Sequence, residues 1–448
     1  MFTTLVLLAI SAGAAAEPLS FAGALDRLQE TPAQHAAQAR WAEAQSKMRS
    51  ARSLGLPTVE LAAQYAHLDS PIEVDLSPLN DLIRLLFPGA TPIPNPILQE
   101  DRFGIAEVTV RWPIFAGGRI GAARSAASLG ASAAHWARAT ADDALFLELV
   151  TRYHAVSVAE RAVEVQEALL SGLGQHDRNA RALYDNDQIS HVERLVSEVA
   201  LAQGEQSALN RRHTLALARS ALATLLSLPD APEPVTELTV PKLDSQLKAL
   251  HSDAEATNPL LRQLVEVRAQ AEQGLKAAKG EYLPTVALFG AYKLDSYQLP
   301  ELIPRWVAGV SISVPVFDGG LRRSHLDEAR AKLAEASALN DKAVDELWLL
   351  VEQRYLAYQD ALARIKVSER TITLTEERLR AERVAFGEGV GRSVDVIDAE
   401  NAAAGAKLAQ LAARYDAAVD YATLMLAAGH REEAENHFRN QPVRGSTP

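Results

Sequence analysis

Two aspartates in the carboxyl-terminal part of the chain are the side chains best placed for charge chemistry. Asp395 and Asp398 stand three residues apart in a segment with a helical pattern, so both carboxylates lie on one helix face. A paired site of this kind attracts cations. Two acidic residues in the first turn of a helix can equally serve only to complement the helix dipole. The residues alone leave both interpretations open.

The sequence contains no recognisable catalytic motif. Its 11 histidines are scattered, no H-E-x-x-H, G-x-S-x-G or Walker pattern occurs, and the two aspartates lack a pocket-forming context. Because there is no cysteine, a disulfide and a thiolate metal site are both excluded. We therefore expect no catalytic residue, no metal site, no cofactor and no enzyme activity. The net charge of -12 also argues against a nucleic-acid partner, which requires a basic face.

The elements that position these residues come from an internal duplication. The motif Pro113-Ile114-Phe115-Ala116-Gly117-Gly118 returns 202 positions later as Pro315-Val316-Phe317-Asp318-Gly319-Gly320. Each motif closes a strand-like run and opens a helical one, and its paired glycines permit a sharp change of backbone direction. We therefore predict two repeats of a strand-to-helix unit, at about 17–229 and 245–430.

Four segments alternate apolar and polar residues as strands do: 56–67, 103–115, 283–294 and 305–317. Their lengths suffice to span a membrane when tilted. A small soluble sheet would show the same alternation. Four strands cannot close a membrane-spanning barrel, and open strand edges are not tolerated in lipid, so a membrane protein of this kind must be an oligomer. A trimer would supply twelve strands.

An insertion distinguishes the first repeat from the second. Leu56-Pro57-Thr58-Val59 matches Leu283-Pro284-Thr285-Val286 at an offset of 227, whereas the offset downstream is 202. The difference falls in the proline-rich segment 69–100, which we predict to be a loop.

Long helices are predicted by two runs, 118–184 and 320–386, which contain no proline and little glycine. Gly172 and Gly174 interrupt only the first run, which indicates either a local bend or tolerated glycines. Ser190 and Ser393 are candidate N-caps of the helices that follow. Sustained heptads predict supercoiled packing against partner helices. In the second run the heptad positions are Val344, Val351, Tyr358, Ile365, Ile372, Leu379 and Phe386.

The two ends of the chain have distinct patterns. The apolar run from Leu5 to Ala16 ends in Ala14-Ala15-Ala16, which predicts a signal peptide over residues 1–16. No Lys or Arg precedes this run, so an upstream start and a buried N-terminal helix stay open as alternatives. Residues 430–448 are rich in polar side chains and predict a polar C-terminal tail.

Together these features resemble the TolC-like family of outer-membrane efflux proteins. The resemblance rests on the duplication, on the two Pro-x-Phe-x-Gly-Gly motifs and on the stretch from Phe386 to Glu400. It implies a mainly helical protein with a small β part, in which 17–448 form a single domain. Long antiparallel coiled-coil helices would form a periplasmic tunnel. Four strands per chain would contribute to a trimeric, 12-stranded outer-membrane β-barrel with the loop 69–100 outside the cell.

The resemblance also implies a function. The chain would be the outer-membrane exit duct of a tripartite efflux or type I secretion system. Its partners would be two further copies of itself, outer-membrane lipid, a periplasmic adaptor (membrane fusion protein) and an inner-membrane RND or ABC transporter. Drug efflux, metal efflux and protein secretion remain open as the transported cargo. A non-channel periplasmic coiled-coil scaffold or adaptor is the alternative function.

For the aspartates, the resemblance implies a position at the periplasmic aperture of the tunnel. Asp395 and Asp398 match the carboxylates that line this aperture in the family, and three copies would gather six of them around one axis. Glu193 corresponds to Asp395 in the first repeat. Such a ring would favour cations over anions.

Two departures from the family pattern concern how the aperture closes. Phe386 stands where a tyrosine would offer a hydroxyl, and Gly391 stands where an arginine would, although Arg392 is adjacent. We expect Gly389 to turn the chain at the tip and Arg392 to belong to the aperture. The bonds that hold it closed cannot be transferred from the family.

Overall fold

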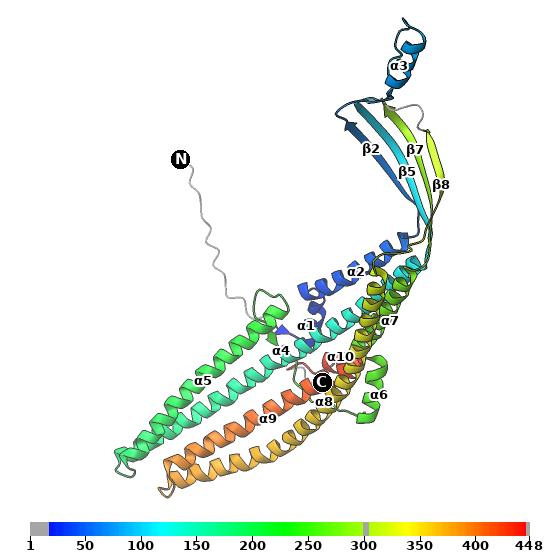
Figure 1. Ribbon diagram of the computed structural model, residues 1–448. Helices are drawn as coiled ribbons and strands as arrows, with labels where there is room; N and C mark the ends of the chain where they lie inside the picture. The colour runs from blue at the N-terminus through cyan, green and yellow to red at the C-terminus, as the bar shows by residue number, and fades with distance from the viewer. Residues whose placement is uncertain (1–17, 299–303, 445–448) are drawn as a thin grey trace, which may run out of the picture. The chain divides into compact units, whose positions relative to one another are not determined.

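The computed structural model describes residues 18–298 and 304–444 of the chain (Figure 1). The predicted signal peptide at 1–16 lies outside the described residues. The chain divides into two compact units. The helical unit comprises Met1–Ala42, Ala133–Val265 and Leu339–Pro448, and the sheet unit comprises Glu43–Ser132 and Glu266–Ala338.

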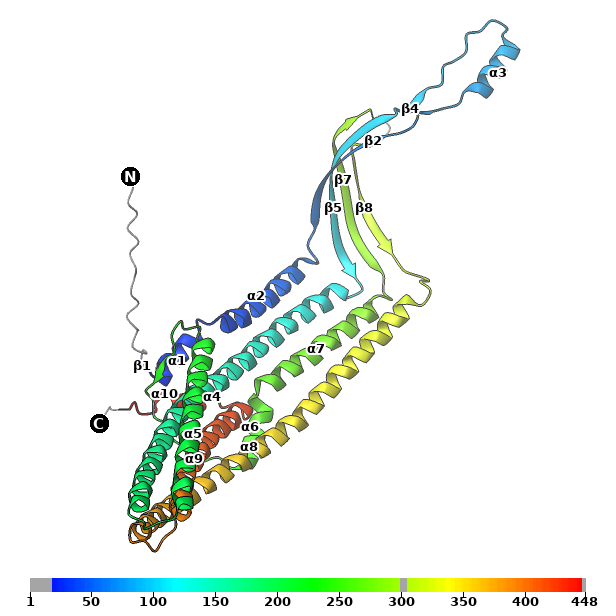
Figure 2. The same cartoon turned by 90° about the vertical axis from the view of Figure 1, so that its left-hand side faces the viewer.

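Four antiparallel strands make up the main sheet of the sheet unit, in the order β2-β5-β7-β8 (Figure 2). They are β2 (Thr58–His67), β5 (Arg102–Ala116), β7 (Thr285–Tyr297) and β8 (Trp306–Ser313). The strand predicted at 305–317 thus ends four residues early. Residues 314–317 belong to no strand, because β7, which pairs with β8, begins at Thr285 opposite Ser313 and offers them no partner.

The register of the sheet gathers the apolar alternates onto one face. Leu61 lies opposite Val108, Val108 opposite Tyr292, and Tyr292 opposite Trp306, and directly opposite residues share a face. The other face carries the polar alternates, among them Glu60, Gln64, Glu107, Arg111 and Ser311. The members of the apolar face are Val59, Leu61, Ala63, Tyr65, Gly104, Ala106, Val108, Val110, Trp112, Val286, Leu288, Gly290, Tyr292, Trp306, Ala308, Val310 and Ile312.

The segment predicted as a loop at 69–100 has structure of its own. It holds a short hairpin of β3 (Ile72–Glu73) and β4 (Ile97–Gln99), and helix α3 (Ser77–Leu86) between them. The Asn80 side chain exchanges two hydrogen bonds of 2.8 Å with the backbone of Ile93, which fastens α3 to the returning chain.

The helices confirm the duplication, because equivalent helices of the two repeats have equal lengths. α2 and α7 have 22 residues each, α4 and α8 have 67 each, and α5 and α9 have 35 each. Their bounds are α2 (Pro32–Ser53), α4 (Arg119–Asp185), α5 (His191–Leu225), α7 (Pro259–Gly280), α8 (Leu321–Gly387) and α9 (Ser393–Ala427). No helix in the described part of the chain is both long and apolar enough to span a membrane.

The main core of the helical unit is built from helices of both repeats. Tyr153 of α4 and Tyr358 of α8 are buried there, the latter at a predicted heptad position. Tyr153 also donates a hydrogen bond of 2.6 Å to the carbonyl of Leu19, in β1 (Pro18–Leu19), which pairs with β6 (Glu233–Pro234). Two short helices complete the unit: α1 (Phe21–Leu28) and α6 (Leu247–Thr257).

The prediction of a polar C-terminal tail at 430–448 was wrong for the part of that segment that the structure describes. Helix α10 (Arg431–Arg439) buries Ala434 and Phe438 in the main core. These two residues are four positions apart and therefore share a helix face. Polar residues occupy the rest of α10, which hid this apolar pair in the sequence.

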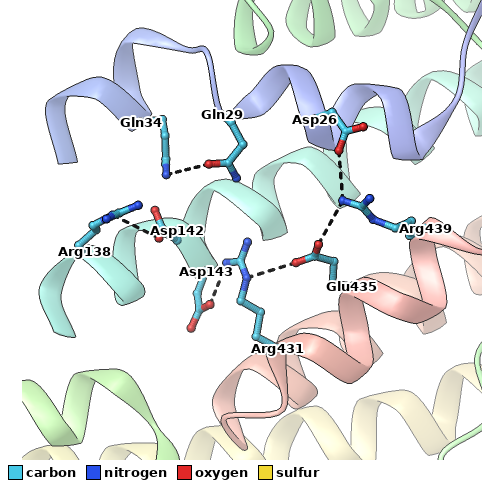
Figure 3. A network of polar contacts seen from close by, with 9 residues as sticks. All are labelled: Asp26, Gln29, Gln34, Arg138, Asp142, Asp143, Arg431, Glu435 and Arg439. Atoms are coloured by element: carbon cyan, nitrogen blue, oxygen red, sulfur yellow. Dashed lines mark hydrogen bonds and ion pairs between the residues drawn. The ribbon is translucent and has the colours of Figure 1, made fainter. Parts of the chain in front are cut away.

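A polar network fastens α10 to its neighbours (Figure 3). The Arg431 guanidinium lies 2.9 Å from the Asp143 carboxylate of α4, and Arg439 lies 3.2 Å from Asp26 of α1 and 3.4 Å from Glu435. Burial raises the pKa of Asp143, which the bond from Arg431 partly offsets. The C-terminal helix is therefore bound to both α1 and α4.

Candidate functional site

The turn between α8 and α9 carries the residues predicted to act at the tip. Gly389 has φ +75°, in the left-handed region, and its N–H donates to the carbonyl of Phe386. A side chain on Gly391 would come within 2.8 Å of the Phe386 backbone nitrogen. The arginine of the family pattern therefore does not fit at position 391 in this turn. Arg392, one residue later, is free of that constraint.

Arg392 pairs with the first of the two aspartates. Its Nε lies 2.9 Å from Oδ2 of Asp395, and its Nη2 lies 2.8 Å from Oδ1, so the contact is bidentate. This bond lowers the pKa of Asp395. The pKa of Arg392 is raised, chiefly by Asp395 and further by Glu193 and Asp398. The structure thus brings Arg392 into contact with Asp395, while Glu193 and Asp398 act on this guanidinium only through weaker electrostatic effects.

Asp398 is the more accessible of the two aspartates. It is exposed, whereas Asp395 is half-buried against Arg392. In the described part of the chain no ion pair forms at Asp398. The two carboxylates share a helix, as the spacing predicts, but Asp395 is largely compensated by its own neighbour. Asp398 therefore presents the less compensated negative charge.

The two predicted N-caps differ. Ser190 caps α5 by accepting a hydrogen bond from the Glu193 backbone N–H at 3.3 Å, which confirms that prediction. Ser393 is not an N-cap, because Arg392 occupies the cap position and Ser393 is the first helical residue of α9. The Ser393 hydroxyl instead lies 2.7 Å from Nε2 of His176 on α4. The Ser393 hydroxyl, which could otherwise cap the helix locally, is therefore engaged by a residue 217 positions away.

A buried joint beside the turn connects α4 with α8 and α9. The rings of His176 and Phe386 lie 4.6 Å apart, and Phe386 packs against Ala180 and Val396. Phe386 is therefore a packing residue of this joint, in the place where the family pattern has a hydroxyl. Burial lowers the pKa of His176, and Arg383 lowers it further, while Asp177 opposes the shift. The His176 ring is thus favoured in its neutral form.

The second component of the joint is an ion pair that packs against a glycine. Arg383 of α8 pairs with Glu400 of α9, whose side chain is almost fully buried. A side chain on Gly172 of α4 would meet the Glu400 carboxylate oxygens at 2.7 Å. Gly172 therefore makes room for this carboxylate, and α4 continues unbroken through it. The sequence could have indicated a special role for Gly172, because the second repeat has a leucine, Leu374, at the equivalent position.

The strand-to-helix junctions lie in the sheet unit. Gly117, Gly118, Gly319 and Gly320 all have positive φ, between 62° and 93°. At Gly117 the backbone also passes so close to Gly280 of α7 that a side chain on either residue would collide with the other's carbonyl. In the second motif, Arg322 Nη1 donates to the carbonyl of Pro315 at 2.7 Å. The motifs with Pro113 and Pro315 thus shape the backbone, and in the second motif Asp318 also pairs with Arg322 at 2.6 Å.

One protein family and several known proteins match parts of the chain. Residues 250–430 match the outer membrane efflux protein family. Protein CyaE of Bordetella pertussis is 27% identical over 68% of this chain and 66% of its own length. Alkaline protease secretion protein AprF of Pseudomonas aeruginosa is 26% identical over 41% of this chain and 39% of its own length. The chain thus spans just under two thirds of the first relative and well under half of the second.

A solved structure shows the same fold over nearly the whole chain. The CmeC outer membrane channel of Campylobacter jejuni superimposes with a TM-score of 0.77, covering 94% of this chain and 89% of that one at 12% identity. At such low identity the likeness shows the fold alone. The match over residues 250–430, the similar relatives and the shared fold agree with the resemblance to the outer membrane efflux protein family.

Proposed function

We propose that this chain is the outer-membrane exit duct of a tripartite efflux or type I secretion system. It forms a homotrimer, conducts substrates passively and carries out no chemistry of its own. An inner-membrane RND or ABC transporter supplies the energy, and a periplasmic adaptor connects the two. The family model and the secretion protein among the relatives support both kinds of system, so the cargo class follows from the transporter.

One observation carries this proposal, namely the apolar face of the four-stranded sheet. Val59, Leu61 and Tyr65 on β2 are each more than two-thirds exposed in the single chain. A soluble protein would cover such a surface, whereas lipid is its natural environment. Both edge strands, β2 and β8, are open in one copy, which lipid does not tolerate. Neighbouring copies would close these edges into a barrel.

The helical unit also has a surface that suits neighbouring copies. On α5, Val192, Leu195 and Val199 are exposed and follow one helix face at spacings of three and four. A stripe of this kind is typical of a helix that packs against another helix. Its exposure in the single chain supports an oligomer whose helices surround a common tunnel.

We further propose that Asp395, Asp398 and Glu193 line the periplasmic aperture, with Arg392 moderating their charge and Gly389 forming the turn. Opening would move the second-repeat helices at this turn. The joint of His176–Ser393 and Arg383–Glu400 is suited to hold those helices against α4 in the closed state.

Ion selectivity tests the aperture, because removing its carboxylates and removing its guanidinium should change the cation preference in opposite directions. Asp395→Ala with Asp398→Ala should lower the cation preference in planar-bilayer recordings, since two carboxylates per copy are lost. Arg392→Ala should raise it, since Asp395 loses the guanidinium that compensates it. Asp398→Ala alone should have a larger effect than Asp395→Ala alone. Unchanged selectivity in the double variant would contradict the assignment.

Bilayer recording of the unmodified protein tests the duct itself and separates it from the alternative of a periplasmic scaffold. A duct conducts ions through a stable pore, whereas a coiled-coil scaffold or adaptor does not conduct at all. Purified oligomer is the sample, because a single copy has open strand edges.

A further inference from the structure

The polar face of the main sheet also carries an aromatic side chain. Phe289 of β7 lies opposite Arg111 of β5 on one side and opposite Gly309 of β8 on the other. Directly opposite residues share a face, and Arg111 belongs to the polar face. Phe289 is 41% exposed there. An aromatic ring therefore lies on the face that the proposed duct turns toward its water-filled interior.

Gly309 makes room for this ring. A side chain at position 309 would come within 2.9 Å of the far end of the ring, its Cζ atom. The ring therefore leans across β8 and lies close to the backbone of the sheet. Because the side chain is still 41% exposed, part of the ring surface is open to a flat molecule.

Arg111 supplies a cation beside the ring. The side chain is exposed, and in the described part of the chain its guanidinium forms no ion pair and no hydrogen bond. Glu60 of β2 lies opposite Thr109, so it stands diagonally from Arg111, at about 7–8 Å. Glu107, by contrast, lies directly opposite Lys293. The guanidinium of Arg111 is therefore available to a bound anion.

Neither the ring nor the guanidinium is a product of the duplication. At the offsets of 227 and 202 that relate the two hairpins, Phe289 corresponds to Ala62, and Arg111 corresponds to Ser313. The strand pairing is the same in both repeats, whereas each of these two side chains occurs in only one of them. The shared framework of the hairpins therefore does not account for either side chain.

We propose that Arg111 and Phe289 form a contact site for aromatic anions on the inner wall of the duct. This inference rests on the proposed function, in which the polar face lines the pore. The guanidinium would bind a carboxylate or sulfonate, and the Phe289 ring would stack on the aromatic part of the same molecule. Directly opposite Cβ atoms lie about 4.5–5.5 Å apart, so one small molecule can reach both side chains.

The site lies at the end of the sheet where the long helices begin. Arg111 stands two residues before the motif that starts at Pro113, and Thr58, the residue opposite it, is the first residue of β2. Three copies would supply three such sites at one level of the pore. Cargo that enters the barrel from the helices would pass this level.

Block of the ion current tests the site. Naphthalenesulfonate, an aromatic anion, should interrupt the current of the purified oligomer in planar bilayers. Cyclohexanesulfonate has the same charge and no aromatic ring, and should block about tenfold more weakly. Arg111→Ala and Phe289→Leu should each weaken block by naphthalenesulfonate about tenfold, because each removes one of the two contacts. Glu60→Gln should strengthen the block, since it removes a carboxylate beside the guanidinium.

Phe103→Leu is the matched control. Phe103 lies on the same face but near the other end of β5, opposite Ala66, so its substitution should leave the block unchanged. Current without the sulfonates shows that each variant has assembled. Equal block by the two sulfonates, or unchanged block in Arg111→Ala and Phe289→Leu, would overturn the site and leave the duct in place. A protein that passes no current would overturn the duct and this inference with it.

Discussion

At the scale of single residues, the burial of the polar His154 side chain is the clearest destabilising feature of the fold. It lies fully buried in the main core, stacked on Phe21 and beside Tyr153 and Phe438. Neither ring nitrogen has a hydrogen-bond partner in the described part of the chain. Burial, with a smaller effect of His437, lowers the pKa of His154 to about 3. The folded protein therefore holds this ring neutral.

The buried ring makes stability depend on pH. The unfolded chain takes up this proton near pH 6.5, but the folded chain does so only near pH 3, so the unfolded state binds more protons between these values. Stability should therefore fall as pH falls, by about 1.4 kcal/mol per pH unit for this group. Thermal unfolding measured across this window checks the slope. His154→Phe should flatten it, and an equal slope in that variant would assign the pH dependence to other groups.

Gly172 allows a second residue-scale prediction, with Gly174 as its matched control. Gly174→Ala should stabilise the protein by about 0.5–1 kcal/mol, because alanine favours a helix and its nearest neighbour is 3.6 Å away. Gly172→Ala should destabilise it by about 1–3 kcal/mol, because its Cβ displaces the Glu400 carboxylate. Combination with Glu400→Ala should remove that cost. Equal effects of the two glycine substitutions on thermal unfolding would show that the space that Gly172 leaves for the Glu400 carboxylate does not contribute to stability.

Sequence reasoning located the charged residues of the tip but not their pairing. Asp395, Asp398 and Arg392 could be assigned to the turn after α8, and Glu193 to the equivalent turn after α4, because the repeat and the family pattern relate the two turns. Their geometry could not be predicted, because the Arg392 side chain has several rotamers and only the folded turn selects the one that reaches Asp395. The joint at His176 was also missed, since a contact across 217 residues leaves no local pattern.

At the scale of elements, the prediction concerns the contribution of helix α10 to stability. Phe438→Ala should cost about 3–5 kcal/mol, because the ring is fully buried among Phe21, Phe146 and His154. Asn436→Ala on the same helix is the control and should have little effect, since Asn436 is exposed. Thermal unfolding of both variants checks this. Similar midpoints for the two would mean that α10 does not contribute to the core.

Sequence patterns predicted the long helices and three of the four strands of the main sheet well. The seven-residue period and the absence of proline predicted α8, and alternation predicted β2, β5 and β7 to within a few residues. The end of β8 was missed because the sequence pattern describes a strand with partners on both sides, and the single chain provides only one. The C-terminal segment was missed because an apolar pair on one helical face is a weak signal.

At the scale of the whole molecule, duplication supplies the framework, and two features distinguish the repeats. The first repeat carries the insertion with α3, and the second carries the paired aspartates. Equal helix lengths and an identical hairpin register show that the duplicated elements have been kept in step. What one copy leaves open, the apolar sheet face and both sheet edges, is what the proposed duct uses for lipid and for neighbouring copies.

The most direct test of this account is the conductance of the purified oligomer in a planar lipid bilayer. We expect discrete, long-lived steps of ion current with a preference for cations, because three apolar sheets would close around a water-filled pore whose tip carries excess negative charge. A protein that inserts as a stable oligomer and yet passes no current, even with Asp395, Asp398 and the joint of Arg383–Glu400 substituted to release the tip, would contradict the account.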